Sequence, residues 1–343
     1  MSFAIKYLTI IVLIISCLLA VHSDSQNQIS DAYINEALED TYKKFKDLKA
    51  GNNADYIPVL AEVDSNIFGV AIVTVDGQVY TVGDIESEVS IQSIAKVFTM
   101  AYVMEESGLQ AIIDNVGVDA TGDVFNSIIA IEKYQGQYMN PFVNPGAIAT
   151  TSMVKGKSAD DIYHKVAAFY DAFAGRTLTL QDDVYISESA TNQRNQALAS
   201  LMFAYGRIKE DPARATDIYT KLGSIGVNTL DLATMAATLA NGGVNPITAK
   251  KVMRHENIAG VLAVMATAGM YDDAGQWLFK TGLPAKSGVG GGILAVSPGK
   301  FGIASISPPL DEAGNSVKGQ LAIEAVSNSL NGNPYDVVPI NMK

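Results

Sequence analysis

Residues 283–308 read LPAKSGVGGGILAVSPGKFGIASISP and hold two apolar, β-branched runs on either side of Pro298-Gly299. Adjacent proline and glycine are typical of a tight turn, so the two runs predict a β-hairpin. The triplet Lys286-Ser287-Gly288 stands directly before it, and three more glycines follow Val289. These glycines fit close packing against a helix better than a phosphate-binding loop, which needs a strand before it and a helix after it. A lone hairpin is not stable in water, so this one must pair with distant strands.

The partner strands are expected near the other end of the chain. Residues 67–84, IFGVAIVTVDGQVYTVGD, form a second hairpin pattern around Asp76-Gly77, the dipeptide that a type I′ turn prefers. Residues 110–285 show mostly helical patterns separated by turns, and KGQLAIEAVSNSL near the C-terminus reads as a strand or a helix. The sequence therefore predicts an α/β fold of the α+β type. A mostly antiparallel sheet joins residues 67–82 and 293–306, helices flank it, and an all-helical subdomain is inserted.

The helix that should follow the first hairpin begins with IQSIAKVFTM, residues 91–100, in which Ser93 and Lys96 are three residues apart. On a helix these positions share one face, about a turn apart. A lysine kept neutral by apolar surroundings can take the proton of a serine hydroxyl. The alternative is a serine that caps the helix and a lysine whose amine reaches water, and the spacing alone favours this ordinary interpretation.

The Lys-Ser-Gly triplet and the Ser-x-x-Lys pair, taken together, favour the catalytic interpretation. Ser-x-x-Lys at the start of a helix, with Lys-Ser/Thr-Gly on an inner strand, resembles the arrangement of the serine β-lactamase and penicillin-binding-protein superfamily. A β-lactamase-like fold is therefore expected, with its site where the sheet meets the helical part. We expect a single catalytic domain over 24–343, with its sheet part at about 24–95 and 283–343 and its helical part at about 96–282.

The composition excludes several other chemistries. The formal net charge of −12 disfavours nucleic acid and anionic membranes as partners. Cys17 is the only cysteine, and of three histidines His164 and His255 lie in patterns typical of a helix surface or a polar stretch. A cysteine nucleophile in a processed chain, a Ser-His-Asp triad and a metal centre are thus disfavoured, and no cofactor is expected.

The N-terminus predicts export. Residues 1–23 combine a lysine, an apolar run and a small-residue cleavage site after Ser23, which is the pattern of a signal peptide. An alternative makes Cys17 a lipidated residue that anchors the protein. Either interpretation places the protein outside the cytoplasm, in the periplasm or the medium. Without such an anchor, no membrane partner is expected after the signal is removed.

Over nearly the whole mature chain, the sequence resembles the serine-dependent glutaminase family. The matching blocks include YIPVLA, DGQVYTVGD, IQSIAKVF, NPFVNPGAI, SESATNQRN, LATMAATLANGGVNPIT, GMYDDAGQW and LPAKSGVGGGILAVSPGKFGIASISPPLDEAGNSVKG. The resemblance implies hydrolysis of L-glutamine to L-glutamate and ammonia through an acyl-enzyme. It also favours a homo-oligomer, a dimer or a tetramer.

The resemblance implies a role for each matching residue. Ser93 is the nucleophile and Lys96 its base, and the N–H groups of Ser93 and Val289 stabilise the oxyanion. Tyr271 and Tyr56 relay protons to the leaving ammonia or activate water. The substrate-binding positions are Ser93, Asn144, Glu188, Asn195, Tyr219, Tyr271 and Val289. Their residue types suit an amino acid, because a carboxylate can bind its ammonium and amides and phenols can bind its carboxylate.

Ordinary structural roles remain open for several of these residues. Glu188 and Asn195 can simply cap a helix, and Tyr219 can be a core aromatic with a wet hydroxyl. Pro145 stands where the family usually has alanine. It should push Asn144 away from the helical region, and if the family's asparagine is helical, affinity for glutamine would fall.

Two rival functions also remain. One is a β-lactamase-like or transpeptidase-like enzyme, and the other is a non-catalytic exported protein that binds glutamine. Turnover of a β-lactam would favour the first, and glutamine binding without ammonia release would favour the second.

Overall fold

The computed structural model describes residues 29–137 and 139–337. The predicted signal peptide at 1–23, and Cys17 within it, lie outside the described residues. Within the described ranges, no helix has both the length and the apolar character needed to cross a membrane.

A five-stranded antiparallel sheet forms one half of the fold, with the strand order β2-β1-β7-β6-β5. Its strands are β1 (Gly69–Thr74), β2 (Val79–Gly83), β5 (Ala285–Ser287), β6 (Gly292–Ser297) and β7 (Phe301–Ile306). The two predicted hairpins meet through β1 and β7, where Gly69 pairs with Ile306 and Thr74 with Phe301. The predicted pairing of 67–82 with 293–306 is therefore confirmed.

The turn of the first hairpin differs from the prediction of type I′. That type requires positive φ at both central residues, but Gly77 (φ +86°) has it and Asp76 does not. The Gly77 N–H donates to the Thr74 carbonyl at 3.0 Å, and Thr74 and Gln78 are joined by the next bond, at 2.9 Å. Val75, Asp76 and Gly77 thus form a three-residue loop with its glycine in the left-handed region, the other common way to close a twisted hairpin.

Helices make up most of the remaining chain. In order they are α2 (Asp31–Phe45), α3 (Pro58–Ala61), α4 (Ala95–Ser107), α5 (Leu109–Asn115), α6 (Ile128–Tyr134), α7 (Asn144–Ser152), α8 (Ala159–Ala174), α9 (Asp182–Thr191), α10 (Gln193–Ala204), α11 (Pro212–Gly223), α12 (Thr229–Ala240), α13 (His255–Ala268), α14 (Ala274–Thr281) and α15 (Val317–Ser329). Two 3₁₀ helices, η1 (Gln92–Ile94) and η2 (Tyr271–Asp273), and a small pair of strands, β3 (Val89–Ser90) and β4 (Gly226–Val227), complete the fold. The C-terminal segment that read as a strand or a helix is the helix α15.

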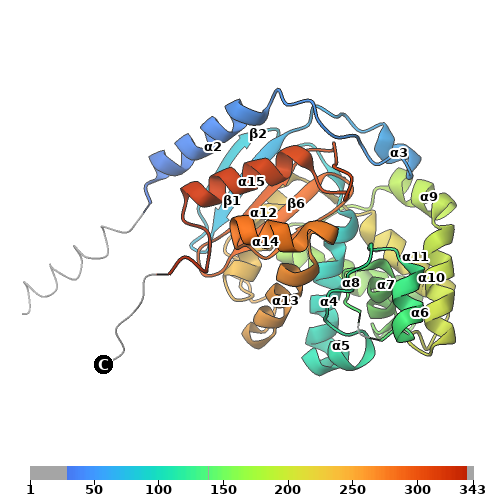
Figure 1. Cartoon of the computed structure of the whole chain (residues 1–343). Coiled ribbons are helices and arrows are strands. Elements are labelled where there is room, and N and C mark those ends of the chain that lie inside the picture. Colours follow the sequence, from blue (N-terminus) through green and yellow to red (C-terminus); the bar gives the residue numbers. More distant parts are fainter. Residues whose placement is uncertain (1–28, 138, 338–343) are drawn as a thin grey trace, which may run out of the picture.

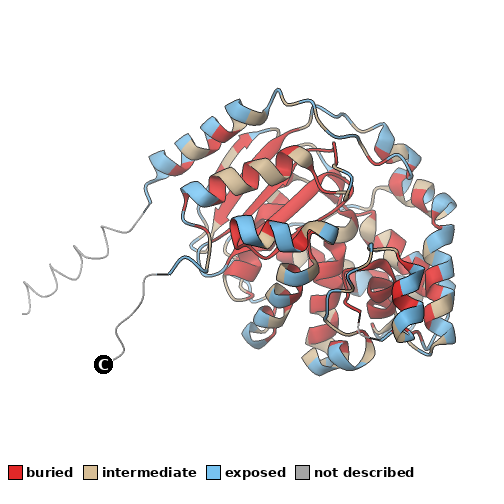
Figure 2. Ribbon diagram, viewed as in Figure 1, coloured by how far each residue is buried: buried red, intermediate tan, exposed pale blue. Residues whose placement is uncertain are grey.

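The sheet buries both of its faces because its strands alternate side chains between two cores. Ala71, Ala304 and their neighbours face α12, whereas Ile72, Ile303 and their neighbours face α2 and α15. Figure 1 shows α2 and α15 over one face of the sheet, and the helices α4 to α11 gathered to one side of it. Figure 2 shows the buried residues along the strands and on the inner sides of the helices. The predicted mixed fold, with an antiparallel sheet flanked by helices, is confirmed.

Gly302 lets α12 lie directly on the sheet. A Cβ placed on this β7 residue would be 2.1 Å from the Ala237 nitrogen and 2.5 Å from the Ala233 carbonyl oxygen. Both atoms belong to the backbone of α12, so neither can move aside as a flexible side chain can.

We expect Gly302→Ala to lower the free energy of unfolding by about 3 kcal/mol, near the upper end of overpacking penalties, because α12 must move as a whole. Gly275→Ala on α14 is the matched control: no atom lies within 4 Å of its Cβ position. Alanine there should raise stability by about 0.5–1 kcal/mol, since glycine is a poor helix former. Urea unfolding measures both variants, and equal effects would contradict the close contact.

Candidate active site

Ser93 stands at the point where a strand becomes a helix. It is the second residue of η1, which follows β3 and leads directly into α4. The Ile91 N–H donates to the Ile225 carbonyl at 2.8 Å, which anchors this entry to the strand pair β3-β4. Because the first N–H groups of a helix have no acceptor within it, the Ser93 N–H is available to a ligand.

The glycine loop between β5 and β6 packs directly on this turn. A Cβ on Gly288 would be 2.7 Å from the Ile91 carbonyl oxygen, and one on Gly290 would be 2.3 Å from that of Ser90. The expected close packing of these glycines is confirmed. No described residue accepts a hydrogen bond from the Val289 N–H. The contact therefore holds a second free N–H beside the turn that carries Ser93.

Lys96 is buried, with 2% of its surface exposed, so the alternative of a lysine that reaches water is excluded. Its Nζ donates to the Phe142 carbonyl at 3.1 Å and to Asn144 Oδ1 at 2.6 Å. Burial lowers the pKa of Lys96 to about 7, although the Glu188 carboxylate opposes the shift. A neutral amine has two N–H bonds, and both are used here, so its lone pair remains free to accept a proton.

Lys286, on β5, is a second buried amine at this site. Its Nζ donates to the Ser287 carbonyl at 2.6 Å and lies 4.2 Å from the centre of the Tyr271 ring. Burial lowers the pKa of Lys286 well below its usual value, and the nearby Lys96 adds to this effect. A positive charge on Lys96 thus disfavours the charged form of Lys286.

Tyr271 belongs to η2 and has a left-handed backbone (φ +52°), which is rare for a bulky residue. Its hydroxyl donates to the Ser287 carbonyl at 3.3 Å, and its ring packs against Phe125 at 5.0 Å. Burial raises the pKa of Tyr271, and a hydrogen bond with the Ser93 hydroxyl opposes the rise. The predicted proton-relay tyrosine is therefore adjacent to the predicted nucleophile.

A cleft of about 910 Å³ opens in front of Ser93. Its wall includes the predicted residues Tyr56, Ser93, Asn144, Glu188, Asn195, Tyr219 and Val289. They come from the segment before α3 and from η1, α7, α9, α10, α11 and the glycine loop. The structure thus brings these predicted residues together. Lys96 and Tyr271 are not in the wall of the cleft, but Lys96 bonds Asn144 and Tyr271 contacts Ser93 and Phe125. Tyr56 is 54% exposed and forms no hydrogen bond with another described residue.

The polar residues of the cleft are connected to Lys96. Asn144 Nδ2 donates to Asn195 Oδ1 at 2.9 Å, and the Tyr219 hydroxyl donates to Asn144 Oδ1 at 3.4 Å. Glu188 is buried within α9, and its Oε2 accepts from Gln92 Nε2 at 3.2 Å. Burial raises the pKa of Glu188, whereas the Gln92 bond and Lys96 lower it. Glu188 and Asn195 lie inside α9 and α10 and make no cap, so the capping interpretation is wrong.

The expectation for Pro145 is corrected. We expected the proline to keep Asn144 out of the helical region, but α7 begins at Asn144 and Val143 is the extended residue (φ −81°, ψ 150°). Pro145 is the second helical residue, where the missing N–H would have no intrahelical acceptor. The Asn144 side chain still contacts Lys96.

Two residues of the site were missed in the sequence. Gln92 has a left-handed backbone (φ +48°), and its amide bonds both Ser90 Oγ and Glu188, each at 3.2 Å. Phe125 lines the cleft and packs on Tyr271. The position of Gln92 next to Ser93 was a usable signal, but nothing in the local sequence marked Phe125.

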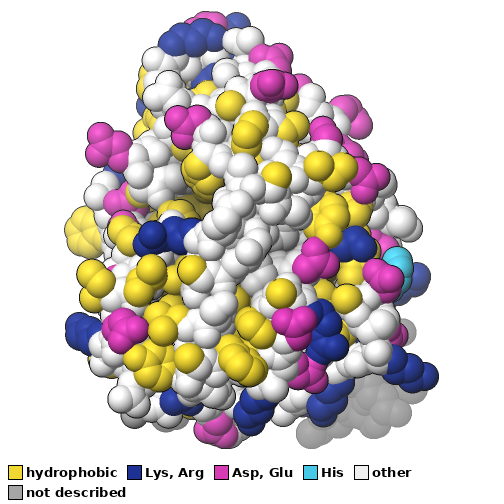
Figure 3. Space-filling view, turned by 90° about the vertical axis from the view of Figure 1, so that its right-hand side faces the viewer, with side chains coloured by type: hydrophobic (Ala, Val, Ile, Leu, Met, Phe, Trp, Pro, Cys, Tyr) yellow, Lys and Arg dark blue, Asp and Glu magenta, His cyan; other side chains and the backbone are white. Residues whose placement is uncertain are grey.

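Charged groups elsewhere do not suggest a different centre. His164 and His255 are exposed, and the described ranges hold no group of three histidine, cysteine or carboxylate residues placed to bind a metal ion. On the face drawn in Figure 3, acidic and basic side chains are interspersed.

Comparisons with known proteins agree with this geometry. The glutaminase family model matches residues 51–335. A glutaminase from Colwellia psychrerythraea is 51% identical over 302 residues, which are 88% of this chain and 97% of that protein. A glutaminase from Brucella canis is 49% identical over 306 residues, 89% of this chain and 96% of that protein.

Solved structures show the same likeness. The structure of the probable glutaminase ybaS superposes with a TM-score of 0.89 at 44% identity and covers 90% of this chain and 100% of that one. The structure of the protein Mglu has a TM-score of 0.85 at 34% identity, covering 89% of this chain and 77% of that one. With a family model matching most of its length and relatives of about half identical sequence, the chain belongs to the glutaminase family, whose reaction is the hydrolysis of L-glutamine to L-glutamate and ammonia.

Proposed function

We propose that this glutaminase hydrolyses L-glutamine through an acyl-enzyme on Ser93, with Lys96 as the base. The observation that carries the proposal is the state of Lys96. Its amine is buried one helical turn from Ser93, and both N–H bonds of its neutral form already have acceptors. Such an amine can remove the Ser93 proton as the oxygen attacks the side-chain amide carbon of glutamine.

The oxyanion of the tetrahedral intermediate is stabilised by the N–H groups of Ser93 and Val289. The contact between the glycine loop and η1 supports this role, because it fixes two unpaired donors before the substrate arrives. Donors fixed in advance stabilise developing charge without reorganising.

Protons reach the leaving ammonia through Lys96 and Tyr271. Tyr271 contacts the Ser93 hydroxyl and lies over the Lys286 amine, so it can pass a proton between the reacting groups. Tyr56, on the exposed wall of the cleft, is the second candidate for the relay and for activating water in deacylation.

The amino and carboxylate groups of glutamine are bound by the polar wall of the cleft. Glu188 receives the α-ammonium, and Asn144, Asn195 and Tyr219 receive the α-carboxylate. Their convergence on one cleft supports these roles, and so does the relative Mglu, which has been solved in its glutamate form. No cofactor is needed for these steps.

Trapping of the acyl-enzyme tests the proposal. We expect hydroxylamine, a better nucleophile than water, to divert part of the acyl group to the γ-glutamyl hydroxamate while ammonia release continues. The ratio of hydroxamate to glutamate should rise in proportion to hydroxylamine. Ammonia release with no hydroxamate would contradict a covalent intermediate. Glutamine binding without ammonia release would favour a non-catalytic protein, and turnover of a β-lactam would favour the rival hydrolase.

The pH dependence should report the buried amine. Lys96 acts as a base in its neutral form, and its pKa is about 7. We therefore expect kcat/KM for glutamine to fall about tenfold per pH unit below pH 7 and to level off above it. Initial rates of glutamate formation between pH 5 and 9, at constant ionic strength, measure this profile. A profile flat down to pH 5 would contradict a titrating base.

We also propose that the described residues act as one catalytic domain, and that the protein is exported, with residues 1–23 removed, and works as a homo-oligomer. The signal-like pattern of those residues supports export, with a lipid anchor at Cys17 as the alternative. Mass spectrometry of the protein recovered outside the cytoplasm would decide between an N-terminus at residue 24 and a lipidated Cys17. Light scattering would detect a dimer or a tetramer, and a monomer would contradict the last proposal.

A further inference from the structure

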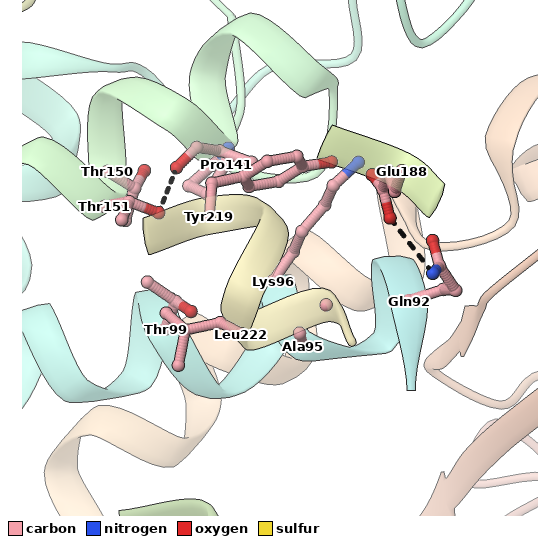
Figure 4. Close-up of a pocket in the computed structure, with 12 residues that line it drawn as sticks. Gln92, Ala95, Lys96, Thr99, Pro141, Thr150, Thr151, Glu188, Tyr219 and Leu222 are labelled. Atoms are coloured by element: carbon pink, nitrogen blue, oxygen red, sulfur yellow. Dashed lines mark hydrogen bonds between the residues drawn. The ribbon is translucent and has the colours of Figure 1, made fainter. Parts of the chain in front are cut away.

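A second, small cavity borders Lys96. Its volume is about 10 Å³, close to the minimum that holds one molecule of the size of water. The cavity and the cleft share Gln92, Glu188 and Tyr219 as lining residues. Figure 4 shows Thr99, Thr150 and Thr151 on one side of Lys96 and Tyr219, and Glu188 on the other. The cavity is therefore adjacent to the reacting groups.

The three threonines around this cavity can only accept a hydrogen bond from a guest. The Thr150 hydroxyl donates to the Gly146 carbonyl at 2.8 Å, and the Thr151 hydroxyl donates to the Ala147 carbonyl at 2.9 Å. The Tyr170 hydroxyl has one proton and donates it to the Ala95 carbonyl at 2.8 Å. The 2.6 Å bond between Tyr170 and Thr99 must then use the Thr99 proton.

The donor protons of the other polar side chains in the cavity wall also have acceptors already. Both amide protons of Gln92 have acceptors, and the Tyr219 hydroxyl donates to Asn144. The two N–H bonds of neutral Lys96 are also used. Glu188 contributes a carboxylate. What remains for a guest is a set of acceptors with a negative charge in the wall.

We propose that this cavity binds the ammonia that the reaction releases, held as ammonium. Ammonium has the size of water, donates four hydrogen bonds and has no lone pair to leave unpaired. Water would donate two bonds and leave its own two lone pairs without donors. This inference rests on the proposed acyl-enzyme at Ser93, because that step produces ammonia beside Lys96.

An ammonium held in this cavity can reverse the acylation step. One of its protons passes to Lys96, and the ammonia so formed attacks the acyl carbon. A C–N bond forms and the ester C–O bond breaks. The Ser93 oxygen regains a proton from Lys96, and one further proton goes to solvent, so that glutamine and free enzyme result.

Exchange of ¹⁵N-ammonium into glutamine during turnover tests the site. We expect ¹⁵N in the remaining glutamine to rise with ammonium and then saturate, because a cavity has one place. Attack by ammonia from bulk solvent would give a dependence that stays linear, and a linear wild-type result would overturn the proposal. Ionic strength is held constant with sodium chloride. Replacing sodium chloride by potassium chloride should leave the half-saturating concentration of ammonium unchanged. If potassium abolished the saturation, the cavity would be a general cation site, and this result would also overturn the proposal.

A double variant locates the effect. Thr150→Val with Thr151→Val keeps the volume of the cavity and removes two acceptors. We expect its half-saturation by ammonium to rise at least about tenfold, while kcat/KM for glutamine without added ammonium stays within about threefold. Thr216→Val is the matched control: this buried threonine also donates to the carbonyl four residues earlier, and it does not line the cavity. Unchanged half-saturation in the double variant would overturn the site, whereas hydrolysis measured in the same assay reports separately on the proposed function.

Discussion

Ser93→Ala should reduce kcat/KM for glutamine by at least about 10⁴-fold, the scale seen when a nucleophile that works with its base is removed. Without the hydroxyl no acyl-enzyme can form, so hydroxylamine should yield no hydroxamate. The fold should persist, because the Ser93 side chain makes no hydrogen bond that the helix start needs: the residue before α4 has no side-chain cap.

The matched control is Ser107→Ala, an exposed serine at the other end of α4. It should leave kcat/KM and the free energy of unfolding nearly unchanged. Ammonia release and far-ultraviolet circular dichroism, measured on both variants, separate a lost nucleophile from a lost helix. Wild-type turnover in a folded Ser93→Ala variant would eliminate the proposed mechanism.

The sheet could be predicted because its signals are local. Alternating β-branched runs and the turn residues at Asp76-Gly77 and Pro298-Gly299 marked both hairpins, and the need to bury them made β1 and β7 partners. The exact turn was not predictable in the same way. Asp76-Gly77 suits two loop lengths, and the register of the flanking strands, which is set by the whole sheet, selected the three-residue loop.

The site residues differ in the same way: some could be predicted from local signals, and others could not. Ser93, Lys96 and Val289 belong to short motifs whose spacing is visible in the sequence. Gln92 and Phe125 acquire their roles from contacts across the fold: Gln92 bonds a residue 96 positions away, and Phe125 packs on Tyr271. Spacing along the chain cannot reveal contacts of that kind.

Lys286 was recognised as part of a motif, but its surroundings were not foreseen. In the structure it is fully buried beside the Tyr271 ring, and the nearby Lys96 adds to the lowering of its pKa. Both lysines owe their altered pKa mainly to burial, which depends on the packing of the helical part against the sheet. The motifs were therefore enough to identify the two lysines, but their protonation states could be inferred only from the folded structure.

Lys96→Met should lower kcat/KM by at least about 10³-fold, within the range expected of a general base that also activates a nucleophile. Methionine keeps an unbranched chain of similar length in the buried position, so the packing of α4 should survive. The variant should bind glutamate, since Asn144 keeps its bonds to Asn195 and Tyr219. The fall in kcat/KM below pH 7 should also disappear, because the titrating amine has been removed.

Lys133→Met, at an exposed lysine on α6, is the matched control and should leave both the rate and its pH profile unchanged. Rates of glutamate formation from pH 5 to 10, measured on the two variants and the wild type, show whether Lys96 or Tyr271 is the base. If Lys96 acts alone, the residual rate of Lys96→Met is small and nearly independent of pH. A residual rate above about 1% of wild type that climbs toward pH 10 would instead transfer the role to Tyr271, whose buried hydroxyl has a raised pKa and becomes a base as the solution turns alkaline. The shape of the residual rate therefore identifies which group removes the proton from Ser93.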